Sequence, residues 1–275
     1  MCLRMALAVL VALVLQPVAA HAQSSQEESG IAVGEGWEFE AGLYLFASAI
    51  DGEIGVRSFT SDVDVPFDKV LENLQMGAMG NVEARHGRWS LIGDGIYMRL
   101  EDDASRASRG GRLLATLEVE IEQTMLAGYG AFTLFEQTRN ANTSEREFWI
   151  DAVAGMRYNR IAVDYDIAAA AFGLTTAADR SSITDWVDPV VGARIGYVPL
   201  RNWLVMAWGD IGGFGVGAEH TWQVMGTLGY RFENGVGLFG GYRAFAIDYE
   251  EGSGNSYLSY DLLYTGPVVG LSYRF

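Results

Sequence analysis

Residues 221–233 read TWQVMGTLGYRFE, a stretch in which apolar and polar residues alternate one by one. Its apolar residues fall on one face of an extended chain: Trp222, Val224, Gly226, Leu228, Tyr230 and Phe232. A period of two is the side-chain spacing of a β-strand and differs from the 3.6-residue period of a helix. The stretch therefore predicts a strand with one apolar face and one polar face.

The same alternation recurs in four other segments, at 113–121, 148–159, 161–171 and 187–197. A tilted strand of about 10 residues crosses a bilayer, and a barrel of such strands leaves no sheet edge in lipid. We therefore predict an all-β fold, an antiparallel transmembrane β-barrel of about 12 strands. This count assumes turns near Gln123 and at 159–160. Ten strands is the main alternative.

Aromatic residues gather beside the shortest predicted turns, as expected of a girdle at a membrane interface: Trp89, Tyr158, Tyr197, Trp203, Tyr230 and Phe232. An even number of strands puts both chain ends in the periplasm. The longer connections are then expected outside the cell: 51–75, 101–111, 137–145, 174–184, 212–218 and 251–256.

The first 22 residues have the features of a cleaved signal peptide. Arg4 precedes an apolar run at 5–15, and Ala20-His21-Ala22 offers a cleavage site. Residues 23–36 are polar and glycine-rich, which predicts a flexible periplasmic lead-in, and 37–275 form the expected barrel. The only cysteine, Cys2, lies within the signal, so no disulfide is expected. This organisation predicts the outer membrane of a Gram-negative cell.

One short helix is expected within the first long loop. It follows Pro66, and its apolar residues have the helical spacing i, i+3, i+4 and i+7: Phe67, Val70, Leu71 and Leu74. Such a helix either buries the apolar side of its own loop or acts as a lid over the barrel.

The charged residues of the chain are mostly acidic, with 35 Asp and Glu against 19 Lys and Arg, so a nucleic acid partner is not expected. The polar strand faces predict a charged lumen. This lumen is either an ion-pair network that fills the barrel or a selective constriction that favours cations. Its expected members are Glu118, Glu120, Glu122, Asp151, Arg157, Asp164, Asp166, Asp188, Arg194 and Arg231.

Catalytic signatures are weak in this sequence. The histidines after residue 22 are His86 and His220, and neither has the spacing of a metal ligand pair. No metal, cofactor or enzymatic activity is expected. A remote alternative is a barrel-embedded hydrolase that pairs Asp210 with His220. The glycine-rich segment 213–217 lacks the lysine and helix of a phosphate loop and is interpreted as flexible.

Several stretches resemble those of uncharacterised outer-membrane β-barrel proteins of Gram-negative bacteria, broadly the small OmpA- and OmpW-like barrels. They include DVDVPFDKVLENL (62–74), GYRAFAIDYE (241–250) and the terminal LSYRF (271–275). The resemblance implies no activity. It implies a signal for the barrel-assembly machinery at Leu271, Tyr273 and Phe275. Outer-membrane lipid, that machinery and periplasmic chaperones are the expected partners of a monomer.

The sequence thus favours a structural or passive envelope role, which includes the possibility of a narrow acidic channel for small solutes. The alternative is an extracellular binding or adhesion protein that acts through its loops. The hydrolase is the least favoured of the three.

Overall fold

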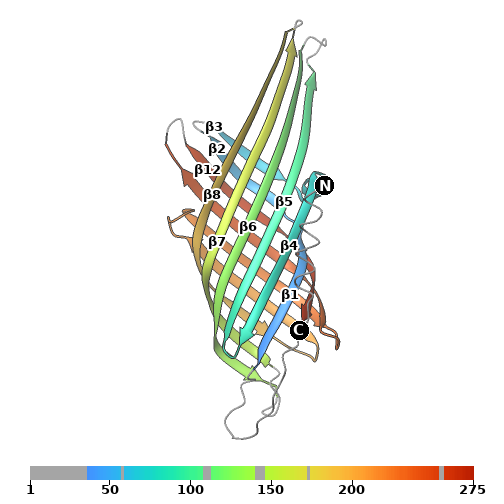
Figure 1. Cartoon of the computed structure of the whole chain (residues 1–275), viewed down its shortest axis with the longest axis vertical. Helices are drawn as coiled ribbons and strands as arrows, with labels where there is room; N and C mark the ends of the chain where they lie inside the picture. The colour runs from blue at the N-terminus through green and yellow to red at the C-terminus, as the bar shows by residue number, and fades with distance from the viewer. Residues whose placement is uncertain (1–35, 57–58, 108–112, 140–145, 172–173, 254–256) are drawn as a thin grey trace. The chain divides into compact units, whose positions relative to one another are not determined.

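The computed structural model describes residues 36–56, 59–107, 113–139, 146–171, 174–253 and 257–275. The predicted signal peptide and nearly all of the lead-in lie outside these residues. The described chain forms twelve strands and one short helix (Figure 1). In chain order these are β1 (Trp37–Phe46), β2 (Ala49–Val56), β3 (Phe59–Val65), α2 (Phe67–Glu72), β4 (Leu74–His86), β5 (Trp89–Ala107), β6 (Leu113–Thr138), β7 (Arg146–Ala171), β8 (Leu174–Tyr197), β9 (Trp203–Gly213), β10 (His220–Arg231), β11 (Val236–Glu251) and β12 (Leu258–Arg274).

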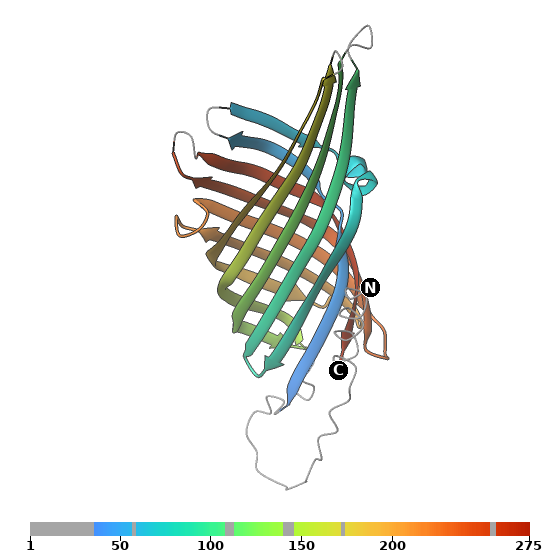
Figure 2. The ribbon, with the colours of Figure 1, turned by 45° about the horizontal axis from the view of Figure 1, so that its top comes forward.

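Ten of these strands close into an antiparallel barrel. The sheet runs β1-β4-β5-β6-β7-β8-β9-β10-β11-β12, and β1 pairs with β12 to complete the ring. Figures 1 and 2 show the tilted strands of this ring. The predicted antiparallel barrel is confirmed. The ring itself has the alternative count of ten strands, and β2 and β3 bring the total to twelve.

The sequence predicts two more barrel strands than the ring has, because it places turns within β6 and β7 that the structure does not contain. β6 and β7 each run without interruption for 26 residues. The predicted turns near Gln123 and at 159–160 are therefore wrong. Neither place has a glycine or proline to reverse the chain. Gln123 and Asn159 are instead buried strand residues.

The corrected count also moves one connection to the other end of the barrel. We call the end with the turns 87–88, 198–202 and 232–235 the inner end, and the end with the tips of β5–β8 the outer end. Because β6 does not turn back near Gln123, the two strand ends joined by this connection, Thr138 of β6 and Arg146 of β7, lie at the inner end, and residues 140–145 are outside the described residues. The prediction that 137–145 lies with the long outer loops is therefore wrong.

A proline interrupts the first barrel strand. β1 and β2 pair with β12 in a single register, except at Ala47 and Ser48. Pro267 on β12 lies opposite this break and has no amide hydrogen for the ladder, although its carbonyl accepts a bond from the Ala47 amide at 3.0 Å. Beyond the break β2 pairs with β3 instead of β4. The β2–β3 hairpin and the β5–β8 strands therefore separate toward the outer end (Figure 2).

The helix α2 connects this hairpin back to the barrel. It begins directly after Pro66, whose carbonyl accepts bonds from the amides of Lys69 and Val70. Val70 is buried and Phe67 is partly exposed, whereas the side chain of Leu71 lies outside the described atoms. Leu74 is the first residue of β4 and the helix ends at Glu72, so the predicted helix is two residues too long.

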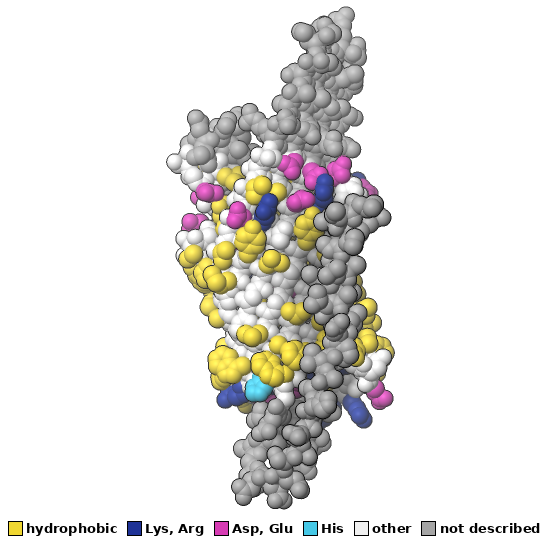
Figure 3. Space-filling model, viewed as in Figure 1, with side chains coloured by type: hydrophobic (Ala, Val, Ile, Leu, Met, Phe, Trp, Pro, Cys, Tyr) yellow, Lys and Arg dark blue, Asp and Glu magenta, His cyan; other side chains and the backbone are white. Residues whose placement is uncertain are grey.

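On the face of the barrel seen in Figure 3, the visible band between the two ends carries hydrophobic and uncharged side chains, and the charged side chains gather near the ends. Outward residues such as Leu43, Leu126, Val191, Val224 and Leu271 are each about half exposed or more. Aromatic side chains gather at the inner end, as predicted for an interfacial girdle: Trp37, Trp89, Trp203, Phe232 and Phe275. Contiguous apolar exposure on this scale is costly in water and is the normal exterior of a membrane barrel. Among the described residues, no helix is long and apolar enough to cross a bilayer.

Toward the outer end the two faces of the strands exchange character: charged side chains face outward and apolar side chains face inward. Glu120 and Glu122 lie on the outer face of β6, where Arg99 is 2.5 and 3.6 Å from them, and Ile121 between them packs inward against the buried core. Asp164 on β7 is exposed as well. Here the strands have passed beyond the apolar belt, so the outer face meets water and the inner face packs against apolar side chains.

This boundary predicts different costs for the same substitution at two equally exposed positions. Val224 lies in the belt and is 55% exposed, whereas Ile183 is 56% exposed and lies seven residues before Val190, the first residue of β8 that pairs with β9. We expect Val224→Arg to lower the free energy of unfolding by roughly 2–4 kcal/mol, because it places a charge in lipid. Ile183→Arg should cost less than about 1 kcal/mol. Urea titration in lipid vesicles measures both, and equal losses would contradict the assigned boundary.

Candidate functional site

A buried polar network crosses the middle of the barrel. One half centres on Arg157 of β7, which has no exposed surface. Its guanidinium donates to Asp210 Oδ1 of β9 at 2.7 Å and to the Tyr129 hydroxyl of β6 at 3.2 Å. Trp208 Nε1 donates to the second oxygen of Asp210 at 2.6 Å, and so does the amide of Gln223. The carboxylate is thus paired and fully hydrogen-bonded, as a buried charge requires.

The other half of the network reaches the opposite wall. Arg243 of β11 donates to Gln223 Oε1 at 2.6 Å and lies 3.6 Å from Asp94 of β5. The Tyr44 hydroxyl of β1 donates to Asp94 at 2.7 Å. The linked side chains span the interior, and we call them the central network: Tyr44, Asp94, Tyr129, Arg157, Trp208, Asp210, Gln223 and Arg243.

An apolar layer fills the lumen on the outer side of this network. Its buried members come from eight of the ten ring strands, β9 and β10 excepted: Phe46, Met79, Ile96, Met125, Ile161, Trp186, Phe245, Ile247, Tyr249, Tyr260, Leu262 and Tyr264. Arg157 lies 4.9 Å from the ring centre of Phe245 and joins the two layers. Buried polar side chains also lie on this side of the network: Arg157 donates to Thr221 Oγ1 at 3.5 Å, and Asn159 donates to Asp188 at 3.1 Å.

The β9–β10 loop folds into the outer part of the barrel. The buried amide of Ala218 donates to Asp188 Oδ1 at 2.7 Å, and Trp186 and Asn159 donate to the other oxygen. A Cβ on Gly217 would lie 2.7 Å from Asp188 Oδ1, so this approach requires glycine. Within 213–217 only Gly217 makes this approach, whereas Phe214 and Val216 are exposed, and the interpretation of the segment as a flexible loop stays a prediction.

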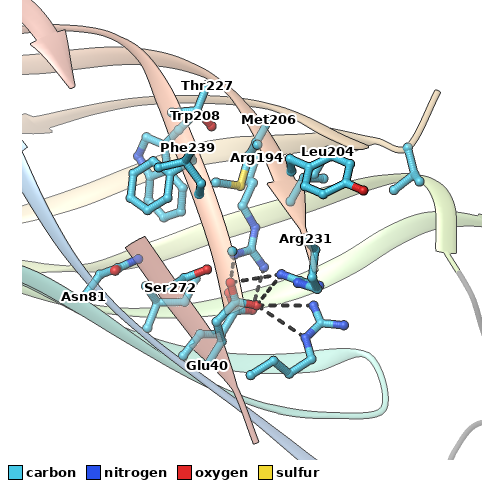
Figure 4. A pocket seen from close by; sticks show the side chains of 18 of the residues that line it. Glu40, Asn81, Arg194, Leu204, Met206, Trp208, Thr227, Arg231, Phe239 and Ser272 are labelled. Carbon is cyan, nitrogen blue, oxygen red and sulfur yellow. Dashed lines mark hydrogen bonds and ion pairs between the residues drawn. The ribbon is translucent and has the colours of Figure 1, made fainter. Parts of the chain in front are cut away.

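A cavity of about 600 Å³ occupies the inner half of the barrel, and we call it the vestibule (Figure 4). The central network forms its floor, and the side chains near the turns at the inner end form its mouth. Its wall carries eight arginines: Arg85, Arg139, Arg146, Arg194, Arg201, Arg231, Arg243 and Arg274. Four carboxylates line it: Glu38, Glu40, Glu83 and Asp94.

Ion pairs organise part of this wall. Arg194 holds Glu83 with two bonds of 2.7 and 2.8 Å and also holds Asp151 at 2.8 Å. Glu40 accepts from Arg231 at 2.8 Å, as Figure 4 shows, and from Arg274 at 3.3 Å. Such bidentate and shared contacts fix the guanidinium planes.

The predicted lumen residues divide into three groups. Asp151, Arg157, Asp188, Arg194 and Arg231 point into the barrel. Glu120, Glu122 and Asp164 were expected in the lumen, and this is wrong because their part of the wall faces water. The side chains of Glu118 and Asp166 lie outside the described atoms.

The terminal motif is placed at the inner end of β12. Leu271, Tyr273 and Phe275 all point outward and are about half exposed. They share one face, as the sequence pattern indicates, and their role in assembly stays a prediction.

Several members of the central network are not among the lumen residues predicted from the sequence. Asp94, Arg243 and Tyr129 lie on inward positions of alternating strands, so the period-two pattern was a signal that could have found them. Gln223 was recognised only as part of a polar face. Asp210 was considered only as a catalytic group.

The acid–histidine pair of the hydrolase hypothesis does not form. Asp210 points inward and is buried, whereas His220 is exposed and lies on the outer face of β10, next to the inward Thr221. The barrel wall therefore separates the two side chains. Within the described part of the chain, no cluster of His, Cys, Asp or Glu could hold a metal ion.

Comparison with known proteins yields a likeness of fold. No family model and no curated protein matches the chain. Among solved structures, the outer-membrane protease OmpT of Escherichia coli matches with a TM-score of 0.52 and 9% identity, over 91% of this chain and all of that one. The translocator domain of the autotransporter NalP of Neisseria meningitidis matches with a TM-score of 0.44 and 14% identity, over 88% and 89% of the two chains.

These findings define the class of the protein. A closed antiparallel ring with an apolar exterior, together with the likeness to the OmpT fold, identifies an outer-membrane-type β-barrel. The finer resemblance to OmpA- and OmpW-like barrels is not tested by these structures. At 9% identity the match shows the fold and says nothing of activity.

The central network predicts a large stability cost when one partner of its buried pair is removed. We expect Asp210→Ala to lower the free energy of unfolding by about 3–5 kcal/mol, because the Arg157 charge then stays buried without its partner. The matched control Asp164→Ala removes an exposed aspartate from the outer face of β7 and should cost no more than about 0.5 kcal/mol. Equal effects in urea titration would show that the network does not stabilise the barrel.

Proposed function

We propose that this protein is an integral outer-membrane barrel with a closed lumen and a passive, structural role in the envelope. One observation carries the proposal: the central network and the apolar layer fill the lumen in succession. Small barrels are commonly filled by their side chains in this way. The barrel is proposed to act as a monomer. Its partners are lipid and, through Leu271, Tyr273 and Phe275, the assembly machinery.

The acidic channel is the less favoured form of this role. Cation selectivity needs carboxylates that face a water path. Glu120, Glu122 and Asp164 face outward, and Asp151 and Asp188 are buried with hydrogen-bonding partners. The remaining candidates for such a path are in the vestibule, whose described wall has more arginines than carboxylates.

The closed lumen predicts that the refolded protein forms no stable conductance steps in a planar bilayer. The triple variant Arg157→Ala/Asp210→Ala/Phe245→Ala removes the buried pair and the ring beside it, and we expect it to conduct. Folding of both proteins is checked by their heat-dependent migration on gels. Stable steps from the unmodified barrel would contradict the proposal, and a folded but silent variant would show that these side chains are not the block.

A second candidate function is extracellular binding, and the long strands of β5–β8 favour it. β6, β7 and β8 have 24–26 residues, far more than the roughly 10 that cross a bilayer. Beyond Leu100, β5 pairs only with β6, and β8 pairs with β9 only from Val190 onward. Among the described residues no other strand pairs with these two edges of the projecting sheet, so an extended peptide could add to either as a further strand.

Shortening this sheet in register tests the binding role. Asp102 pairs with Val119 and Tyr165 pairs with Arg180, so residues 102–119 and 165–180 can each be replaced by an Asn-Gly turn. A displayed peptide library is selected against the full barrel in nanodiscs. We expect the enriched peptides to lose binding to the trimmed barrel, which keeps its belt and lumen. Peptides that bind both forms equally, or a library without enrichment, would contradict the binding role.

A further inference from the structure

We propose that the vestibule binds a small organic anion, a carboxylate, sulfonate or phosphate carried on a flat apolar body, which enters from the inner end. This site goes beyond the closed structural role of the barrel. It does not depend on the lumen being sealed to ions.

The size and direction of the vestibule fit such a ligand. Its volume of about 600 Å³ lies within the range of small-molecule sites. The central network forms the floor, so a solute reaches the cavity past the inner turns. The ligand would therefore come from the side on which β1 begins and β12 ends, which is the predicted periplasmic side.

The charge of the wall favours an anion, although the whole chain has a formal charge of −16. Eight arginines and four carboxylates line the cavity. Glu136 and Asp151 do not line the cavity but add two carboxylates that bind its wall residues Arg85, Arg146 and Arg194. Two positive charges remain in excess.

The excess can be assigned to particular side chains. Arg139 donates to the carbonyl of Val198 at the mouth and has no carboxylate partner among the described residues. Arg201 lies on the adjoining turn, is exposed, and likewise lacks a carboxylate partner in the described part of the chain. These two guanidinium groups are therefore available to an anion that arrives at the mouth.

Two buried donors lie in side chains of the vestibule wall. The indole Nε1 of Trp149 and the Nε of Arg231 have no hydrogen-bond partner in the described structure. Buried donors without acceptors are costly, typically about 1–3 kcal/mol. Both atoms are themselves buried, so a ligand in the vestibule reaches them only after neighbouring side chains shift, and the proposal rests on the charge and shape of the wall instead.

The vestibule wall also has apolar side chains, and these are the reason for proposing a ligand with an apolar body. Leu204, Met206 and Phe239 point into the cavity beside the arginines (Figure 4). Arg146 stacks on the Trp149 ring with 4.2 Å between the guanidinium carbon and the ring centre, which makes a flat surface of mixed character. A purely inorganic anion would leave these surfaces uncovered, whereas an aromatic or aliphatic anion would use both.

Calorimetry with two matched probes tests the charge requirement. The full barrel in phosphatidylcholine nanodiscs is titrated with 2-naphthalenesulfonate and with the neutral 2-naphthalenesulfonamide, and empty nanodiscs give the background. We expect one sulfonate per barrel, at least about tenfold tighter binding than the sulfonamide, and weaker binding at high salt. Equal binding of the two probes, or no binding above background, would overturn the proposal.

Variants locate the site. Arg139→Gln/Arg201→Gln should weaken sulfonate binding about tenfold, because two charged donors at the mouth are lost without leaving a carboxylate unpaired. Glu38→Gln, which removes a negative charge from the same wall, should tighten it about twofold. The control Arg99→Gln makes the same change on the outer face near the opposite end and should have no effect. Gel migration checks that each variant is folded. A control that weakens binding as much as the double variant would overturn the assignment.

Discussion

The constraint on which this structure depends is closure of the sheet in a medium without water. A lipid-exposed strand edge would leave backbone groups without partners, so β1 must pair with β12. Closure in turn creates an interior that has to be filled or hydrated. Because the ring has only ten strands, side chains from opposite walls can meet across it, and the Arg157–Asp210 pair and its neighbours do so.

The interior is divided by this meeting of side chains. On the outer side, apolar residues pack as they would in a soluble core, and the β9–β10 loop folds against Asp188. On the inner side the walls do not meet, and the arginine-rich vestibule remains. The same barrel thus combines a sealed section, which suits an envelope element, with a cavity of a size and chemistry that suit a ligand.

Much of the fold could be predicted from the period-two pattern, including the antiparallel barrel, the aromatic inner end and the inward positions of Asp151, Arg157, Asp188 and Arg194. The number of strands in the ring and the outward position of Glu120 could not be predicted from this pattern. Alternation shows that two faces differ but does not show which face meets lipid, water or core. A strand that leaves the bilayer keeps its alternation, but its outward face then meets water instead of lipid. The carboxylates of this outer part, such as Glu120, were therefore assigned to the wrong face.

The sequence by itself determined the class of the protein, since alternating strands of sufficient length have few other stable arrangements in an envelope. The partners of each inward residue were decided only by the tertiary structure. Asp210 binds Arg157, 53 positions away, and Arg194 binds Glu83, 111 positions away. Such contacts depend on the strand order and register around the whole ring, which alternation within one strand does not contain. The filled lumen and the vestibule are consequences of that register.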